Sequence, residues 1–311
     1  MKKFLVNISL FAVFTILFYV IVMPIWSSIL PPFMAKNVRS CMGCYGHTFT
    51  RMKDAAKTKD IDVLIVGSSH AYRGIDPRIF EKEGITAFNL GSSAQTPINT
   101  KALLHQYLEK IKPKMVLYEA YAGTMNIDGV ESSLDILSNN KIDINSIEMA
   151  NKMHNLLAYN TLIFSSFRQV FGLNDRFKEA LKQMGDHYIS PTGFVETEYR
   201  PNIFNKEGIS KWNLIEGQKE ELKNNVAYIE SKGIKVFLIQ APITKTLYNS
   251  VNNNPEVDKF LSGVGTYKSY QNAVALKDST DFFDNNHLNQ IAVEKFNKVL
   301  VKDVKAFLDK K

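Results

Sequence analysis

The residues with the clearest chemical potential lie in a short turn, Gly67-Ser68-Ser69-His70, which follows the apolar, β-branched run 62–66. A strand that ends in Gly-Ser-Ser places a hydroxyl at its carboxyl end, where backbone N–H groups can stabilise an oxyanion. A serine in such a turn can act as a nucleophile. The pattern alone is weak, because Gly and Ser are also common turn residues.

A second segment, Asp284-Asn-Asn-His287, has the residue types of a general base and its orienting carboxylate. An Asp and a His three residues apart on one turn can face the same cleft. The carboxylate then holds the imidazole tautomer, and the imidazole takes a proton from a serine. A surface turn explains an isolated Asp-x-x-His equally well. The two segments together are more specific than either one alone.

Apolar runs and helical spacing predict that these segments lie on an α/β scaffold with a parallel sheet. In such a sheet the loops that follow the strands meet at one edge. The serine turn, a second turn at Gly91-Ser92-Ser93 and the Asp-His segment are therefore expected to meet there. Strands are predicted at 62–66, 86–90, 115–118 and 235–240, a weaker strand at 272–276, and helices at 77–83, 99–111, 215–231 and 290–308.

The serine turn, the turn at Gly91 and the Asp-His segment resemble the sequence blocks of the SGNH/GDSL hydrolase family. The resemblance covers residues 61–309, apart from the middle of the chain. That family has its nucleophile in a Gly-Asp-Ser-like turn, an oxyanion-hole N–H from a glycine after the second strand, and a final Asp-x-x-His block. The resemblance implies a three-layer α/β/α, flavodoxin-like fold. It implies Ser69 as the nucleophile, with His287 and Asp284 as its base pair. The N–H groups of Ser69 and Gly91 would be the oxyanion donors, and we expect no cofactor and no metal.

Two positions depart from the family pattern. The family's third block carries an Asn that completes the oxyanion hole, whereas this chain has Tyr118-Glu-Ala-Tyr-Ala-Gly-Thr-Met-Asn126, which leaves Asn126 as a distant substitute. Ser68 stands in place of the family's Asp and is the second candidate for the nucleophile. His70 is expected to be a bystander or a substrate contact. An α/β-hydrolase is disfavoured, because Ala71 replaces the second glycine of Gly-x-Ser-x-Gly.

The amino-terminal segment predicts membrane attachment. The chain is almost uninterruptedly apolar from Phe4 to Ile25, which is long enough for the ~20 residues that a bilayer span needs. This run exceeds a usual signal-peptide core, and no Ala-x-Ala-like site follows it. We therefore interpret residues 1–30 as an uncleaved anchor, with a cleaved signal peptide as the alternative. Lys2 and Lys3 favour a cytoplasmic amino terminus, which puts the rest of the chain outside.

The remainder is expected to form a juxtamembrane connector, residues 31–60, and one α/β domain, residues 61–311. The domain holds an insertion at about 124–212 that lacks strong strand patterns. We expect this insertion to cap the core, since loops and caps on such scaffolds usually make the substrate surface. Its recognisable pieces are helix-like stretches at 146–157 and 164–171 and a turn-rich patch at 185–201.

Two cysteines, Cys41 and Cys44, lie in the connector as Cys-x-x-Cys. Outside the cytoplasm they are expected to form a local disulfide or to remain spare thiols. A thioredoxin-like redox site needs a strand before the motif and a helix at it, which this context lacks. A zinc site that included His47 would have no clear fourth ligand.

Charge narrows the choice of partners. The 311-residue chain has a net charge of +7, but no basic run interleaved with aromatic residues, so a nucleic-acid partner is not expected. Attraction to anionic lipid headgroups or to an anionic polymer is the more specific interpretation, and a merely basic surface is the simpler one.

The Gly-Ser-Ser and Asp-x-x-His-Leu blocks behind an anchor resemble one branch of the family. This branch holds the D-alanine-transfer protein of teichoic-acid modification and bacterial exopolysaccharide O-acetyltransferases. The resemblance implies an extracytoplasmic serine esterase or O-acyltransferase that acts on ester-linked acyl groups of a cell-surface glycan or polymer. Membrane lipid and a multi-pass membrane acyltransferase are the implied partners. The alternative is a non-catalytic glycan-binding or assembly subunit, which the missing third-block Asn favours.

Overall fold

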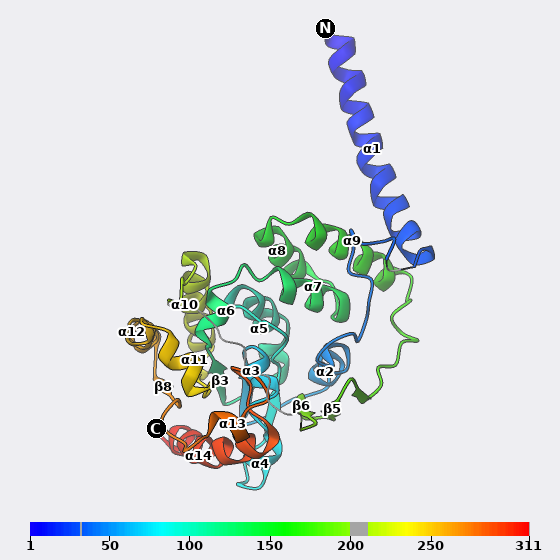
Figure 1. Cartoon of the computed structure of the whole chain (residues 1–311). Helices are drawn as coiled ribbons and strands as arrows, with labels where there is room; N and C mark the ends of the chain where they lie inside the picture. The colour runs from blue at the N-terminus through cyan, green and yellow to red at the C-terminus, as the bar shows by residue number, and fades with distance from the viewer. Residues whose placement is uncertain (32, 200–210, 311) are drawn as a thin grey trace.

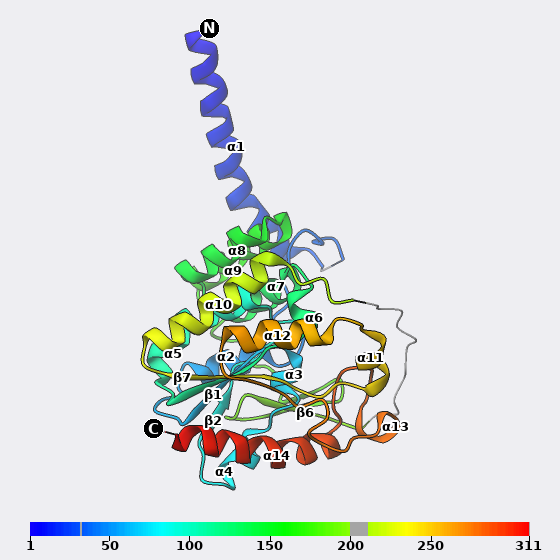
Figure 2. The ribbon, with the colours of Figure 1, turned by 90° about the vertical axis from the view of Figure 1, so that its left-hand side faces the viewer.

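The structure, a computed structural model, describes residues 1–31, 33–199 and 211–310. A long helix, α1 (Lys2–Ile29), projects from a body that is built around a five-stranded sheet (Figure 1). Turning the molecule by 90° shows the sheet between a group of helices next to α1 and the carboxyl-terminal helix α14 (Gln290–Asp309) on the far side (Figure 2).

The sheet has the strand order β2-β1-β3-β7-β8, and every pairing is parallel. Numbered by their order along the chain, these strands follow the 2-1-3-4-5 arrangement of flavodoxin-like folds. The predicted α/β fold with a parallel sheet is therefore confirmed. The strands are β1 (Val63–Val66), β2 (Ala87–Asn89), β3 (Met115–Glu119), β7 (Lys235–Gln240) and β8 (Tyr267–Ser269).

Helices cover both faces of this sheet, which makes the three layers. Leu64 and Val116 point to one face and pack in a core with α5, α10 and α12. Ile65 and Leu117 point to the other face and pack in a core with α4 and α14. Strands that are covered on both sides need apolar residues at every position, which is why β1 reads Val-Leu-Ile-Val. The remaining covering helices are α4 (Pro77–Glu81), α5 (Pro97–Ile111), α10 (Glu216–Ser231) and α12 (Asn254–Val264).

Four predicted strands and four predicted helices match elements of the structure, but the strand predicted at 272–276 is wrong. The fifth strand is β8, which pairs with β7. Residues after it form a turn, in which Ala273 N donates to Tyr270 O. Val274 and Leu276 are apolar because they pack against the core from a loop, so an apolar pattern there does not indicate a strand.

The helical part of the insertion differs from its predicted pieces. The stretch predicted at 146–157 spans two helices, because His154 adopts a left-handed backbone (φ 47°) and the side chain of Asn155 caps the next helix. The piece predicted at 164–171 is the second half of that helix. The helices are α6 (Ala122–Met125), α7 (Val130–Asn139), α8 (Ile144–Met153) and α9 (Leu156–Val170).

The insertion, which was predicted to consist of helices and loops without strong strands, also contains an antiparallel sheet of short strands at 182–197. These strands have two to four residues and are mostly half-buried, so they are too short to show a periodic pattern. Two of them occupy about half of the patch predicted as turn-rich at 185–201. Residues 200 and 201 of that patch lie outside the described residues. The strands are β4 (Lys182–Gln183), β5 (Asp186–Ile189) and β6 (Phe194–Thr197).

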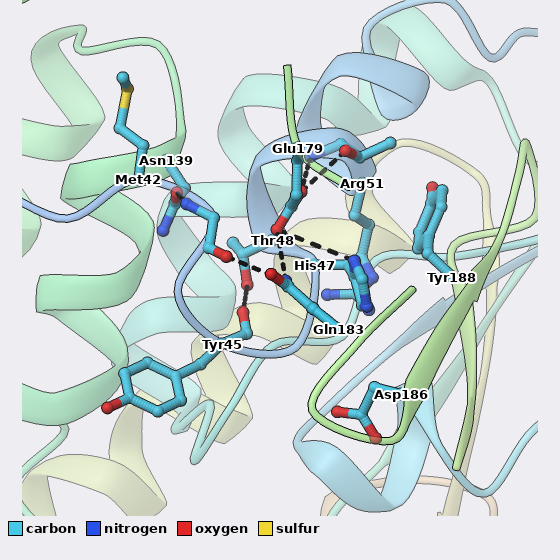
Figure 3. Close-up of polar contacts among 12 residues, drawn as sticks. Met42, Tyr45, His47, Thr48, Arg51, Asn139, Glu179, Gln183, Asp186 and Tyr188 are labelled. Atoms are coloured by element: carbon cyan, nitrogen blue, oxygen red, sulfur yellow. Dashed lines mark hydrogen bonds and ion pairs between the residues drawn. The ribbon is translucent and has the colours of Figure 1, made fainter. Parts of the chain in front are cut away.

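The predicted connector is tied to the insertion through residues 41–55 (Figure 3). Cys41 and Cys44 form a disulfide with their Cα atoms 5.9 Å apart. Glu179 Oε2 accepts hydrogen bonds from the N and Oγ1 atoms of Thr50, at 2.8 and 2.7 Å, at the start of helix α2 (Thr48–Ala55). Because Met52 of α2 also belongs to the main core, this part of the connector is fixed to the body.

Candidate active site

The side chains of Ser69, His287 and Asp284 lie together at the carboxyl edge of the sheet. His287 Nε2 is 2.7 Å from Ser69 Oγ, and His287 Nδ1 is 2.8 Å from Asp284 Oδ2. Ser69 and His287 are separated by 218 positions in the chain. All three residues are half-buried. The structure thus brings the three predicted residues into one hydrogen-bonded chain, which we call the outer group, while their catalytic role stays a prediction.

Two interactions give the serine turn its shape, one with the neighbouring strand β3 and one within the turn itself. Gly67 has a φ of 140°, and a Cβ there would lie 2.6 Å from Glu119 O, so only glycine fits between β1 and β3. Ser68 Oγ then accepts a hydrogen bond from His70 N at 3.2 Å and caps the short helix α3 (Ser69–Tyr72). Ser69 is therefore the first residue of α3, and its side chain reaches the edge of the sheet.

The Asp-His turn is also held by local hydrogen bonds. Asp284 Oδ1 accepts from the N–H groups of Asn286 and His287 at 2.9 and 2.7 Å. Burial alone would raise the pKa of Asp284, but the hydrogen bonds and charge of His287, together with those backbone N–H groups, lower it below its ordinary value. Asp284 is therefore ionised at neutral pH and can orient the imidazole.

A second serine–histidine–acid group lies beside the first. Ser68 Oγ is 3.2 Å from His70 Nδ1 and donates to Glu119 Oε2 at 3.3 Å. These three residues, which we call the inner group, are at most 5% exposed. Burial raises the pKa of Glu119 to about 8, while burial and the nearby His287 lower the pKa of His70 to about 3. Both side chains are therefore mostly uncharged at neutral pH.

Sequence reasoning missed the inner group in part. It took Ser68 as the alternative nucleophile and His70 as a bystander or substrate contact, and it did not single out Glu119. An acidic residue that ends the otherwise apolar strand β3 was the available signal. The ring of His70 stacks on the ring of His287 with centroids 4.9 Å apart, so His70 helps to hold the predicted base in place.

Two of the predicted oxyanion groups, the Gly91 N–H and the Asn126 side chain, have hydrogen-bond partners elsewhere. Gly91 N donates to Asn89 Oδ1 at 3.1 Å. Gly91 does pack tightly against the serine turn, since a Cβ there would lie 3.0 Å from Ser68 O. Asn126 Oδ1 accepts a hydrogen bond from Asn213 N at 3.0 Å. In this geometry Gly91 and Asn126 support the surrounding loops.

An open cavity of about 330 Å³ adjoins Ser69. Ala94 lines this cavity, and its backbone has a left-handed conformation (φ 48°), which is uncommon for alanine. The aromatic rings of Tyr121 and Trp212 form part of its wall, with their centroids 5.6 Å apart. Sequence reasoning had not selected these residues. Ser93 and Ala94 are the described residues of the second-strand turn that line the cavity together with Ser69.

No family model and no curated protein matches this chain. Three solved structures are similar to it in part. A Bacteroides fragilis protein assigned as an acylhydrolase has a TM-score of 0.43 at 9% identity, over 85% of this chain and 98% of that chain. A GDSL-like lipase from Bacteroides thetaiotaomicron has a TM-score of 0.41 at 9% identity, over 83% and 99%. The lipase/acylhydrolase from Enterococcus faecalis has a TM-score of 0.40 at 14% identity, over 81% and 99%. These names describe those proteins, and the function of this chain rests on its own residues.

Proposed function

We propose that this protein is a membrane-anchored serine esterase or O-acyltransferase of the SGNH/GDSL type. Ser69 is its nucleophile, His287 its general base, and Asp284 the carboxylate that orients the base. The observation that carries the proposal is the hydrogen-bonded chain of the outer group, with its contacts of 2.7 and 2.8 Å. An imidazole at this distance from a hydroxyl can take the proton as the oxygen attacks a carbonyl.

The proposed reaction begins when Ser69 Oγ attacks the carbonyl carbon of an ester and its proton passes to His287 Nε2. The carbonyl oxygen becomes an oxyanion, for which the N–H of Ser69 and the backbone around Ala94 are the proposed donors. The Gly91 N–H would first have to leave Asn89. The ester C–O bond then breaks, the leaving alcohol takes the proton from His287, and the acyl group stays on Ser69.

The second half of the reaction releases the acyl group. Water or a sugar hydroxyl gives a proton to His287 and attacks the acyl carbon, which completes hydrolysis or transfer. In both halves His287 carries a positive charge in the transition state. The lowered pKa of Asp284 keeps a negative charge 2.8 Å from Nδ1 to stabilise it.

The proposed substrate is an acyl group that is esterified to a cell-surface glycan or other polymer. The open cavity beside Ser69 can admit a group at the end of a large substrate, and the rings of Tyr121 and Trp212 at its wall suit the apolar face of a sugar. The net charge of +7 suits an anionic polymer.

Helix α1 supports the membrane part of the proposal. It is long and apolar enough to cross a membrane, with a mean hydropathy of 2.5. Lys2 and Lys3 favour a cytoplasmic amino terminus, so the body would lie outside the cytoplasm. A tethered enzyme can receive its acyl group from a multi-pass membrane acyltransferase, which we include as the proposed partner.

The second candidate is a non-catalytic glycan-binding or assembly subunit. The observation that favours it concerns the loop directly after β3, whose residues at the cavity are Tyr121, Gly123, Thr124 and Ile127. None of these four carries a side-chain amide, and the Oδ1 of Asn126 accepts a hydrogen bond from Asn213 N instead. Such a subunit would bind the polymer without forming an acyl intermediate.

A fluorophosphonate probe separates these two functions, because it reacts covalently with an activated serine. Wild type and the matched Ser68→Ala variant should become labelled, with the probe on the peptide that contains Ser69, whereas Ser69→Ala should not. His287→Ala should be labelled much more slowly. A folded wild-type protein that resists the probe would favour the binding subunit, and equal labelling of Ser69→Ala would remove Ser69 from the reaction.

A further inference from the structure

Exposed apolar side chains gather on the side of the body next to α1. Among the described residues after α1, fifteen large apolar side chains are exposed, and eight of them fall in the segments 33–34 and 144–173. Isolated exposed apolar residues are normal, but a cluster marks a surface that meets a partner. The eight are Phe33, Met34, Ile144, Ile147, Leu156, Val170, Phe171 and Leu173. We call them the apolar patch.

Most of this patch belongs to α8, α9 and the turn that follows. In both views of the ribbon, α8 and α9 form the surface of the body that is nearest to α1, while α14 lies on the opposite side (Figures 1 and 2). Four apolar residues of α9 recur at spacings of seven, four and three, which puts them on one face of the helix. They are Leu156, Ile163, Phe167 and Val170.

The same helix packs against α1. Tyr19 OH donates to Asn160 Oδ1 at 2.9 Å. Met23 is buried with Phe164, and the partly buried Ile163 packs against the same cluster. The patch is therefore continuous with the surface through which the body holds α1.

The length of α1 sets the height of this contact in a bilayer. A span of ~20 residues covers the hydrocarbon core, so a span that starts at Phe4, directly after the two lysines, ends near Met23. Tyr19 and Met23 would then lie at the outer edge of the hydrocarbon, and the residues of α9 that touch them would lie at the same depth. Leu156 and Val170, 69% and 78% exposed, would face lipid and not bulk water.

We propose that α8, α9 and the turn at 171–173 form a second membrane contact, which rests in the outer lipid interface of the bilayer that α1 spans. This inference depends on the part of the proposed function that places α1 in a membrane. It adds that the body does not swing freely on its anchor. The bilayer is the occupant that the observations favour, because the patch adjoins the helix that would already lie in it.

The test uses the full chain reconstituted into vesicles of phosphatidylcholine and phosphatidylglycerol. An environment-sensitive fluorophore is attached at one introduced cysteine, in Leu10→Cys, Phe171→Cys or Ile291→Cys, while the disulfide keeps Cys41 and Cys44 unreactive. Position 10 lies within α1, position 171 within the patch, and position 291 is the matched control, an exposed apolar residue (58%) at the start of α14. Quenching is measured with spin-labelled lipids and with aqueous iodide, and thermal melting confirms that each variant is folded.

We expect the label at 10 to be quenched by deep lipid spin labels and the label at 171 by shallow ones. The label at 291 should be quenched by iodide several-fold more strongly than the label at 171. If position 10 is lipid-quenched but position 171 is as accessible to iodide as position 291, α1 is an anchor and the second contact is wrong. If neither 10 nor 171 meets lipid, the anchor itself fails, and the contact fails with it.

Discussion

The outer and inner groups use the same residue types, a serine, a histidine and a carboxylic acid, yet they differ in burial. The side chains of the outer group are half-buried, and its Ser69 lines an open cavity that Ser68 and His70 also line. The inner group lies within the protein, with no side chain more than 5% exposed. Residue type alone therefore does not tell which group is suited to catalysis.

Burial decides the charge of each acid. Glu119 lies in an apolar interior that raises its pKa to about 8, so it is mostly protonated at neutral pH. Hydrogen bonds from His287 and from backbone N–H groups lower the pKa of Asp284 despite its partial burial, so it is ionised. Only an ionised acid can balance the imidazolium that forms when a histidine takes a proton, and this condition selects the outer group.

The inner group supports the outer one. His70 and Phe283 each stack on the ring of His287, at centroid distances of 4.9 and 5.3 Å. The pKa of His70 is lowered to about 3, so its ring is neutral and does not repel the imidazolium of His287. The inner group thus packs an uncharged ring against the predicted base.

The largest expected difference between the two groups is in the loss of turnover when the serine of each is replaced. Ser69→Ala should lower turnover of an ester substrate by up to ~10⁶-fold, whereas Ser68→Ala should lower it by less than ~10-fold, because only Ser69 contacts His287. The double variant Ser69→Ala/His287→Ala should be no worse than either single one, since members of one catalytic unit are not additive. Steady-state acyl release is measured for wild type and the four variants. An inactive Ser68→Ala beside an active Ser69→Ala would exchange the roles of the two groups.

Substituting the two acids should also change turnover unequally, with the larger loss again in the outer group, but the difference should be smaller than for the serines. Asp284→Asn should lower turnover by ~10⁴-fold, because it removes the charge that orients and stabilises His287. Glu119→Gln should leave turnover at pH 7 within ~10-fold, because Gln resembles the protonated carboxyl that is already present. Both variants are compared with wild type in one assay, with circular dichroism as the control for folding. Equal losses at the two positions would contradict the distinction between a charged and a neutral acid.

The smallest expected effect is on stability and concerns Glu119 alone. Its raised pKa means that the folded protein keeps a proton that the unfolded chain loses between about pH 4.5 and 8. This contribution to the free energy of unfolding is complete below pH 4.5 and falls as the pH rises, by up to about 1.4 kcal/mol per pH unit. Glu119→Gln should remove the decline, so its stability relative to wild type should increase from pH 5 to pH 8.

Urea unfolding of wild type and Glu119→Gln at several pH values measures this difference. Titration of His70 affects both proteins alike and cancels in the comparison. A constant difference in urea midpoint across the range would mean that Glu119 is ionised in the folded protein, which would make the two groups electrostatically alike.

Local interactions explain which parts of the site were predictable. The serine turn depends on the positive φ of Gly67 and on the cap that Ser68 provides. The Asp-His turn depends on hydrogen bonds that Asp284 accepts from residues two and three positions away. Contacts of this range are encoded in neighbouring residues. The alternation of apolar strands and helices likewise predicted the parallel sheet and the edge at which these turns meet.

The elements that were missed depend on distant partners. The strand next to β7 is Tyr267–Ser269 and not 272–276, and the short strands of the insertion have too few residues for a period. A strand is stabilised by its neighbours in the sheet more than by its own propensity. The sequence of such a segment therefore does not tell whether it forms a strand or a loop.

By itself, the sequence determined the fold class, the two turns that carry Ser69 and His287, and a helix able to span a membrane. Only the tertiary structure brought Ser69 within 2.7 Å of a histidine 218 positions away. It also buried Glu119 and His70 beside them and packed α9 along α1. The physical reason is that the pKa of a carboxyl or an imidazole, and the exposure of an apolar face, depend on how much water the rest of the chain removes from them.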